Sequence, residues 1–222
     1  MGAGLKFTFF QLYEVFPWLM SRIPGPHQKT LSHFKFIYDL VKEEIEKHKE
    51  NQSLHEPRDF IDYYLLQLKR SKNEPSNTYD EDNLAACIVD FFIAGTETSA
   101  TTLQWALLYI TNHPDVQDEV YKEIQTNCSS GLICYQDRKK LPYTNAVIHE
   151  ILRINYILSF GARICLGEQI ARMEIFLVFT NLLRNFRFQL PRGVKRLSEE
   201  PMNGLTVHPH SYKICAIPRH NA

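Results

Sequence analysis

One cysteine lies between two glycines and directly before a run of strong helix formers, and this arrangement constrains the fold more than any other feature of the chain. Cys165 is flanked by Gly161 and Gly167, and Arg163 precedes it by two positions. Segment 168–174 favours a helix that begins just after the cysteine. Because a helix N-terminus favours an anion, Cys165 is placed to act as a thiolate, the form in which cysteine binds a metal. The alternative is a buried structural cysteine in a tight turn.

The neighbours of this cysteine also suit a flat prosthetic group. Gly161 and Gly167 lack side chains and allow the backbone to approach a planar macrocycle closely. Arg163 carries a planar guanidinium that could pair with a haem propionate. The combination is typical of a loop that gives an axial thiolate to haem iron, in iron protoporphyrin IX.

Three segments of the chain, in this order, resemble motifs of the cytochrome P450 superfamily. Residues 94–99 (Ala-Gly-Thr-Glu-Thr-Ser) resemble its oxygen-activating stretch, and residues 150–153 (Glu-Ile-Leu-Arg) resemble its Glu-x-x-Arg motif. Residues 161–172 resemble its haem-loop signature, Gly-x-Arg-x-Cys-x-Gly followed by Glu-x-x-Ala-Arg. The sequence is most similar to microsomal family 2 of vertebrates, especially its J subfamily, over nearly the whole chain.

The resemblance implies roles for the oxygen-activating stretch. Thr98 and Glu97 would deliver protons during oxygen activation, and Ala94 and Gly95 would lie against the haem. The local sequence agrees, because Gly95 weakens a helix and the hydroxyl of Thr98 or Ser99 can bond back to a carbonyl, opening the helix to a water molecule. Without the resemblance, Thr98 and Glu97 would be interpreted as an N-cap-type threonine and a solvated glutamate.

Glu150 and Arg153 are three residues apart and are expected to form an ion pair on one helix face. The resemblance implies that a later arginine completes this pair as a structural lock around the haem pocket. Only residues 154–157 separate Arg153 from Leu158, where the haem loop begins, whereas the family has several tens of residues there. Leu158 stands where the family usually has Phe, and Phe160 is expected to shield the sulfur in part. We therefore expect a chain that is truncated at its N-terminus and internally deleted after Arg153.

Hydrophobic spacing predicts a mainly α fold. An amphipathic helix is expected over about 29–49, and Pro57 opens the next helix. A long helix should begin at a capping box of Thr78 and Glu81 and end at 112, before a helix that Pro114 opens. Segments 187–190, 205–208 and 212–215 alternate like short strands.

These elements fit a partial cytochrome P450 fold. The expected organisation is a single partial domain over 1–222. Residues 1–153 would hold the lid-proximal and central helices, and residues 154–222 would hold the haem loop, the proximal helix and the C-terminal strands.

Composition excludes several classes of protein. The 25 basic and 25 acidic residues give no net charge, so no nucleic-acid partner is expected. The odd number of cysteines indicates reduced thiols on a cytosol-facing protein, and Cys128 with Cys134 lacks the second ligand pair of a zinc site. The sequence contains no run of about 18 apolar residues, so we do not expect a transmembrane anchor in it. The aromatic start, with Phe7, Phe16 and Trp18 among its residues, could lie in a membrane interface or in a core.

Two functions follow from the resemblance. The first is a haem-thiolate monooxygenase at the cytosolic face of the endoplasmic reticulum, which oxidises a lipophilic fatty acid or xenobiotic with O2 and electrons from an NADPH-dependent reductase. The second is a catalytically inactive fragment or splice-type product that holds no haem and is at most a binding or regulatory partner. A basic face for the reductase could include Arg184, Arg187, Arg192 and Lys195, which are otherwise solvated surface charges.

Overall fold

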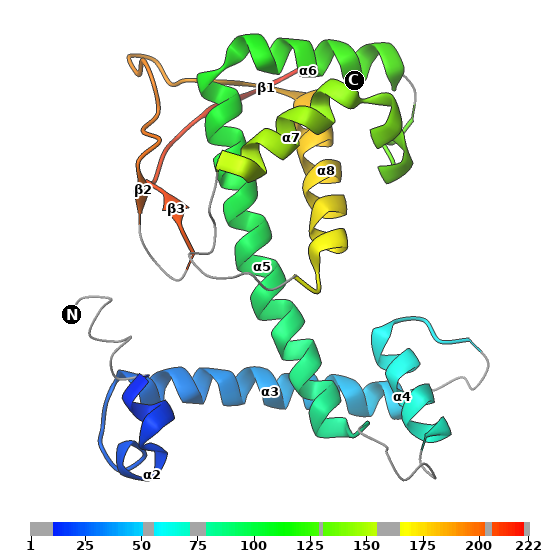
Figure 1. Ribbon diagram of the computed structural model, residues 1–222, viewed down its shortest axis with the longest axis vertical. Coiled ribbons are helices and arrows are strands. Elements are labelled where there is room, and N and C mark those ends of the chain that lie inside the picture. Colours follow the sequence, from blue (N-terminus) through cyan, green and yellow to red (C-terminus); the bar gives the residue numbers. More distant parts are fainter. Residues whose placement is uncertain are drawn as a thin grey trace. The chain divides into compact units, whose positions relative to one another are not determined.

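A computed structural model describes residues 11–50, 56–71, 79–128, 131–154, 165–202 and 206–219. The chain divides into two compact units, residues 1–93 and 94–222 (Figure 1). Helices dominate both units, and short antiparallel strands occur only near the C-terminus of the described residues. The predicted mainly α class is therefore confirmed.

The first unit is built from α2 (Pro17–Met20), α3 (Pro26–Glu50), α4 (Phe60–Arg70) and the start of α5 (Glu81–Asn112). The amphipathic helix predicted over 29–49 is confirmed as α3. Its apolar face packs against α4 and α5 in one core, which consists of Val41, Ile45, Leu65, Leu84, Ala85, Ile88 and Val89.

The cap of α5 differs from the expected one. Thr78, the first residue of the predicted capping box, lies outside the described residues. Instead, the carboxylate of Asp80 accepts a hydrogen bond of 2.6 Å from the backbone N–H of Asn83. An aspartate in this place satisfies one of the free N–H groups of the first turn. The helix ends at Asn112, as predicted.

A histidine links α3 to the N-terminus of α4. The ring of His48 contacts the Glu44 carbonyl through Nδ1 at 2.8 Å and an Asp59 carboxylate oxygen through Nε2 at 2.8 Å. Asp59 caps α4 by accepting the N–H of Asp62, and the buried Asp62 pairs with Arg58 at 2.7 Å. The hydrogen bond to the Glu44 carbonyl raises the pKa of His48 above 6.5, and the guanidinium of Arg58 lowers the pKa of Asp62 below 3.8.

We expect this link to be strongest between the ordinary pKa values of Asp and His. The stabilisation from His48 is complete below pH 6.5 and is lost as pH rises through its raised folded-state pKa, whereas that from Asp62 is lost as pH falls below 3.8. Because Asp59 is half exposed, His48→Gln should cost less than about 1 kcal/mol at pH 5.5 and less still at pH 8.5. Urea unfolding of both proteins at the two pH values measures this. An equal cost at both would contradict it.

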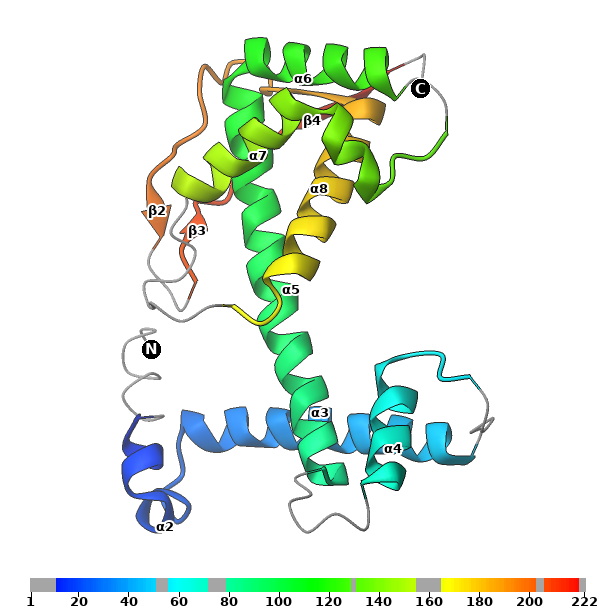
Figure 2. The same cartoon turned by 45° about the vertical axis from the view of Figure 1, so that its right-hand side comes forward.

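The second unit contains the end of α5 and the helices α6 (Pro114–Asn127), η1 (Tyr135–Lys140), α7 (Pro142–Ile154) and α8 (Glu168–Asn185). In both views α7 and α8 lie beside the C-terminal part of α5, and α6 runs across the end of this group (Figures 1 and 2). Pro114 opens α6 as predicted.

The strands only partly match the prediction. β1 (Phe186–Gln189) pairs antiparallel with β4 (Cys215–Pro218), and β2 (Pro201–Met202) pairs with β3 (His208–Pro209). The strand expected over 187–190 is present, but the one expected over 212–215 begins at Cys215, because pairing with β1 sets its bounds. β2 was not predicted, since two residues are too few to show alternation.

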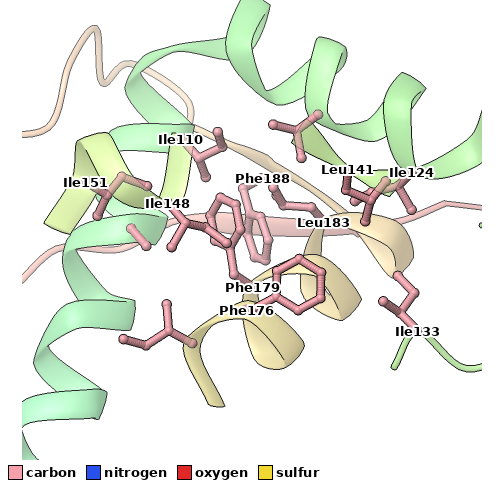
Figure 3. Packing of buried hydrophobic residues seen from close by; sticks show 13 residues of the cluster. Ile110, Ile124, Ile133, Leu141, Ile148, Ile151, Phe176, Phe179, Leu183 and Phe188 are labelled. Atoms are coloured by element: carbon pink, nitrogen blue, oxygen red, sulfur yellow. The ribbon is translucent and has the colours of Figure 1, made fainter. Parts of the chain in front are cut away.

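The core of the second unit lies among α5, α6, α7, α8 and β1 (Figure 3). Phe176, Phe179 and Leu183 project from α8 at helical spacing and are almost fully buried. They meet Ile148 and Ile151 of α7 in this core. The apolar face of α8 thus fixes the helix that follows Cys165.

Two observations concern membranes. Among the described residues, α5 is long and apolar enough to cross a bilayer by length and composition, a test that core helices of soluble proteins also pass. The expected absence of an anchor therefore stays a prediction. Phe16 and Trp18 are exposed, whereas Phe7 lies outside the described residues.

Candidate active site

Cys165 lies exposed at the entry to α8. Gly167 occupies the N-cap position and provides no side-chain cap, while the N–H of Glu168 bonds to the Cys165 carbonyl at 3.3 Å. The carboxylate of Glu168 forms an ion pair with the guanidinium of Arg172 at 2.8 Å. The positive end of the α8 dipole therefore faces the segment that carries the thiol and favours an anionic ligand there. Phe160, Gly161 and Arg163, the other predicted residues of this loop, lie outside the described residues.

The surface next to the cysteine is apolar and open. Leu166 and Ile170 are 88% and 67% exposed. A Cβ added at Gly167, or at Gly95 on α5, would meet no atom of the described residues within 4 Å. A thiol, an exposed apolar surface and two glycines with free space fit a planar apolar group such as haem.

α5 carries the second group of predicted residues. The hydroxyl of Thr98 donates a hydrogen bond of 2.6 Å to the Ala94 carbonyl, which is the back-bonding predicted for this position. Ser99 does not bond back and instead donates to a Glu174 carboxylate oxygen at 2.9 Å. α5 runs without interruption through Gly95, so the predicted opening of the helix is not seen.

The bond from Ser99 to Glu174 connects the two groups. Glu174 lies in α8, nine residues after Cys165 and two turns into the helix, and Ser99 directly follows Thr98. Figure 2 shows the N-terminal turn of α8 beside the middle of α5. Two segments that are far apart in the sequence, 94–99 and 165–174, are thus brought to the same part of this unit.

The sequence analysis missed a polar network around Glu97. Nε2 of His208, in β3, lies 3.2 Å from a carboxylate oxygen of Glu97 and 2.7 Å from the hydroxyl of Thr206. Nδ1 of the same ring lies 3.3 Å from the hydroxyl of Thr101 on α5. Only the alternation of polar and apolar residues over 205–208 hinted that Thr206 and His208 share one face of a strand.

Glu150 and Arg153 form the predicted ion pair. Nε and Nη2 of Arg153 donate to the two carboxylate oxygens of Glu150 at 2.7 and 2.6 Å, and this guanidinium lowers the pKa of Glu150. Both side chains are exposed, unlike the buried lock that the resemblance implied. Glu150 also lines a cavity of about 380 Å³, whose walls are mainly apolar residues of α5 and α7.

Comparison with known proteins identifies the family. The family model for cytochrome P450 matches residues 2–160 and, in a second segment, residues 158–216. The chain belongs to the cytochrome P450 family. The cofactor of this family is haem with an axial thiolate, and its members are monooxygenases.

Cytochromes P450 of subfamilies 2J and 2C are similar to nearly the whole chain. Cytochrome P450 2J2 from Homo sapiens is 34% identical over 275 aligned positions, which cover 94% of the chain and 55% of the relative. Cytochrome P450 2J5 from Mus musculus is 32% identical, and the alignment covers 94% of the chain and 54% of the relative. Cytochrome P450 2C21 from Canis lupus familiaris is 30% identical, and the alignment covers 95% of the chain and 57% of the relative. The chain spans about half the length of these curated relatives.

The alignments also bear on the interval after Arg153. They contain more positions than the 222 residues of this cytochrome P450 chain, so the relatives carry residues within the aligned range that the chain lacks. The two segments that match the family meet at residues 158–160, between Arg153 and Cys165. That the missing positions lie after Arg153 stays a prediction.

Proposed function

We propose that this chain is a haem-thiolate monooxygenase in which Cys165 is the axial ligand of the haem iron. The hydrogen bond between Ser99 and Glu174 carries the proposal, because it joins the helix that bears Thr98 to the helix that Cys165 precedes. When bound, the haem supplies the activation of O2, and its thiolate ligand favours cleavage of the O–O bond.

The chain's own residues would bind the haem and move protons. Gly167 and Gly95 leave space for the macrocycle, and Ala94 lies exposed one residue before Gly95. Arg163 would pair with a propionate, with Gly161 and Phe160 beside it in the loop. The hydroxyl of Thr98, which already donates to the Ala94 carbonyl, retains lone pairs that can accept a hydrogen bond from water.

The finer parts of the proposal concern substrate and partners. The substrate would be a lipophilic fatty acid or xenobiotic, with electrons from an NADPH-dependent reductase at the endoplasmic reticulum. Two cations of the predicted basic face are already engaged, since Arg187 pairs with Asp118 at 2.9 Å and Arg184 donates to the Gly131 carbonyl. Arg192 and Lys195 are exposed and would contribute most to a reductase contact.

One observation favours the second candidate function, a family remnant that holds no haem. Glu150 and Arg153 form an exposed pair, and the relatives carry residues within the aligned range that this chain lacks. Such a chain would at most act as a binding or regulatory partner.

The reduced carbon monoxide difference spectrum separates the two functions. The chain, expressed with added haem, should give the red-shifted Soret band of a thiolate ligand. Cys165→Ala should lose this band completely, because the variant lacks the thiol proposed as the axial ligand. Cys215→Ala, which changes another exposed cysteine, is the matched control and should keep it. Soluble wild-type chain without the band would contradict the proposal and favour the remnant.

A further inference from the structure

A histidine contacts the predicted proton-delivering acid from outside the family motifs. His208 lies in β3, and its Nε2 reaches the Glu97 carboxylate on α5 at 3.2 Å. The side chains of His208 and Glu97 are 32% and 57% exposed, so the pair lies at the edge of the unit and is open to water. Imidazole is the side chain whose ordinary titration range spans neutral pH, which makes it a suitable proton partner for a carboxylate.

Two threonines fix this histidine without fixing its protonation state. Thr101 and Thr206 are buried and face the two ring nitrogens, at 3.3 Å from Nδ1 and 2.7 Å from Nε2. A hydroxyl can either donate or accept a hydrogen bond, so each threonine can satisfy its ring nitrogen with or without a proton. Thr206 also lies 3.5 Å from the Glu97 carboxylate. The ring can therefore gain or lose a proton while it keeps its partners.

We propose that His208 is a positioning residue that holds Glu97 and exchanges a proton with it. The imidazolium gives its Nε2 proton to the Glu97 carboxylate, which leaves a neutral imidazole and a carboxylic acid. Glu97 passes this proton on, and the imidazole regains one from a hydronium ion or a buffer acid in the solvent, which leaves water or the buffer base. The inference rests on the proposed function, because the exchange affects the reaction only if Glu97 delivers protons during oxygen activation.

The pair itself can be tested without haem. In the full chain with ¹⁵N-labelled histidines, Glu97→Gln should change the ring ¹⁵N resonances of His208 at neutral pH, because the charged partner is lost. The resonances of His210, an exposed histidine two residues further on, should stay the same and provide the internal control. Unchanged resonances of His208 would overturn the inference.

The proton role is tested in the haem-loaded chain. His208→Gln keeps a donor that can reach Glu97 but carries no charge, so it separates holding the carboxylate from supplying the proton. We expect the yield of product per NADPH to fall about tenfold or more. His210→Gln should behave like the wild type. A full product yield in His208→Gln would overturn the proton role.

Failure of the proposed function gives a different pattern. In that case the wild-type chain would form no product, with or without a change at His208. The ring spectra of the haem-free chain would still decide whether Glu97 and His208 form a pair.

Discussion

Replacing Phe179 with alanine should lower the free energy of unfolding of the second unit by about 3–5 kcal/mol. Phe179 is 1% exposed and lies in α8, where its ring packs in the core with Phe176 and Phe188 (Figure 3). The loss combines the transfer free energy of the removed ring with the cost of the cavity it leaves, because helices on several sides prevent collapse. This is a large share of the total stability of an ordinary domain.

Urea unfolding measures the effect, with Val178→Ala as the control. Val178 precedes Phe179 on the same helix but is exposed, so its loss should cost far less. Similar urea midpoints for the two variants would show that the buried face of α8, which includes Phe179, does not hold this helix in the core. Because α8 follows Cys165, we also expect Phe179→Ala to weaken haem binding without touching the thiol.

The sequence predicted those parts of the fold that follow from local patterns. α3 and α6 have strong three- and four-residue spacing, and Pro114 marks the start of α6 whatever lies around it. The helix after Cys165 was predicted from the strong helix formers in 168–174. These elements are set by residues close together in the chain, and tertiary contacts only adjusted their ends.

The parts that the sequence did not predict depend on distant partners. Asp80 caps α5, whereas the sequence predicted a capping box of Thr78 and Glu81, and the start of β4 is set by its pairing with β1. Thr98 or Ser99 was expected to bond back within the helix, and Thr98 does so, whereas Ser99 donates to Glu174 of α8, a charged acceptor that makes a stronger hydrogen bond.

The site shows the same division. The motifs named Cys165, Thr98 and Glu97, but no pattern in the sequence could bring His208 to Glu97 from 111 positions away. The spacing of Glu150 and Arg153 left open whether the pair is exposed or buried, because burial depends on what packs over a helix. The motifs therefore indicated which residues to consider for the site, whereas the contacts around these residues depend on segments that are distant in the sequence.

A buried glutamine completes the edge of β1. Gln117 of α6 is 1% exposed, and its amide binds Phe188 on both sides of the peptide, accepting from the N–H at 2.7 Å and donating to the carbonyl at 2.9 Å. It also donates to the Ile110 carbonyl at 3.3 Å. β1 pairs with β4 along one edge, so the side chain of Gln117 takes the place of a neighbouring strand on the other.

Gln117→Met should therefore destabilise the second unit by about 2–4 kcal/mol, because methionine fills a similar volume but leaves the N–H and carbonyl of Phe188 buried and unpaired. Gln104→Met, at an exposed position of α5, is the matched control and should change the unfolding free energy by less than about 0.5 kcal/mol. Chemical denaturation measures both, and amide exchange of Phe188 should accelerate only in Gln117→Met. If both variants were equally stable, packing rather than hydrogen bonding would hold β1 against α6. The contact between Gln117 and Phe188 also joins the strand pair to the core around α8. Its loss should therefore also destabilise α8, the helix that follows Cys165.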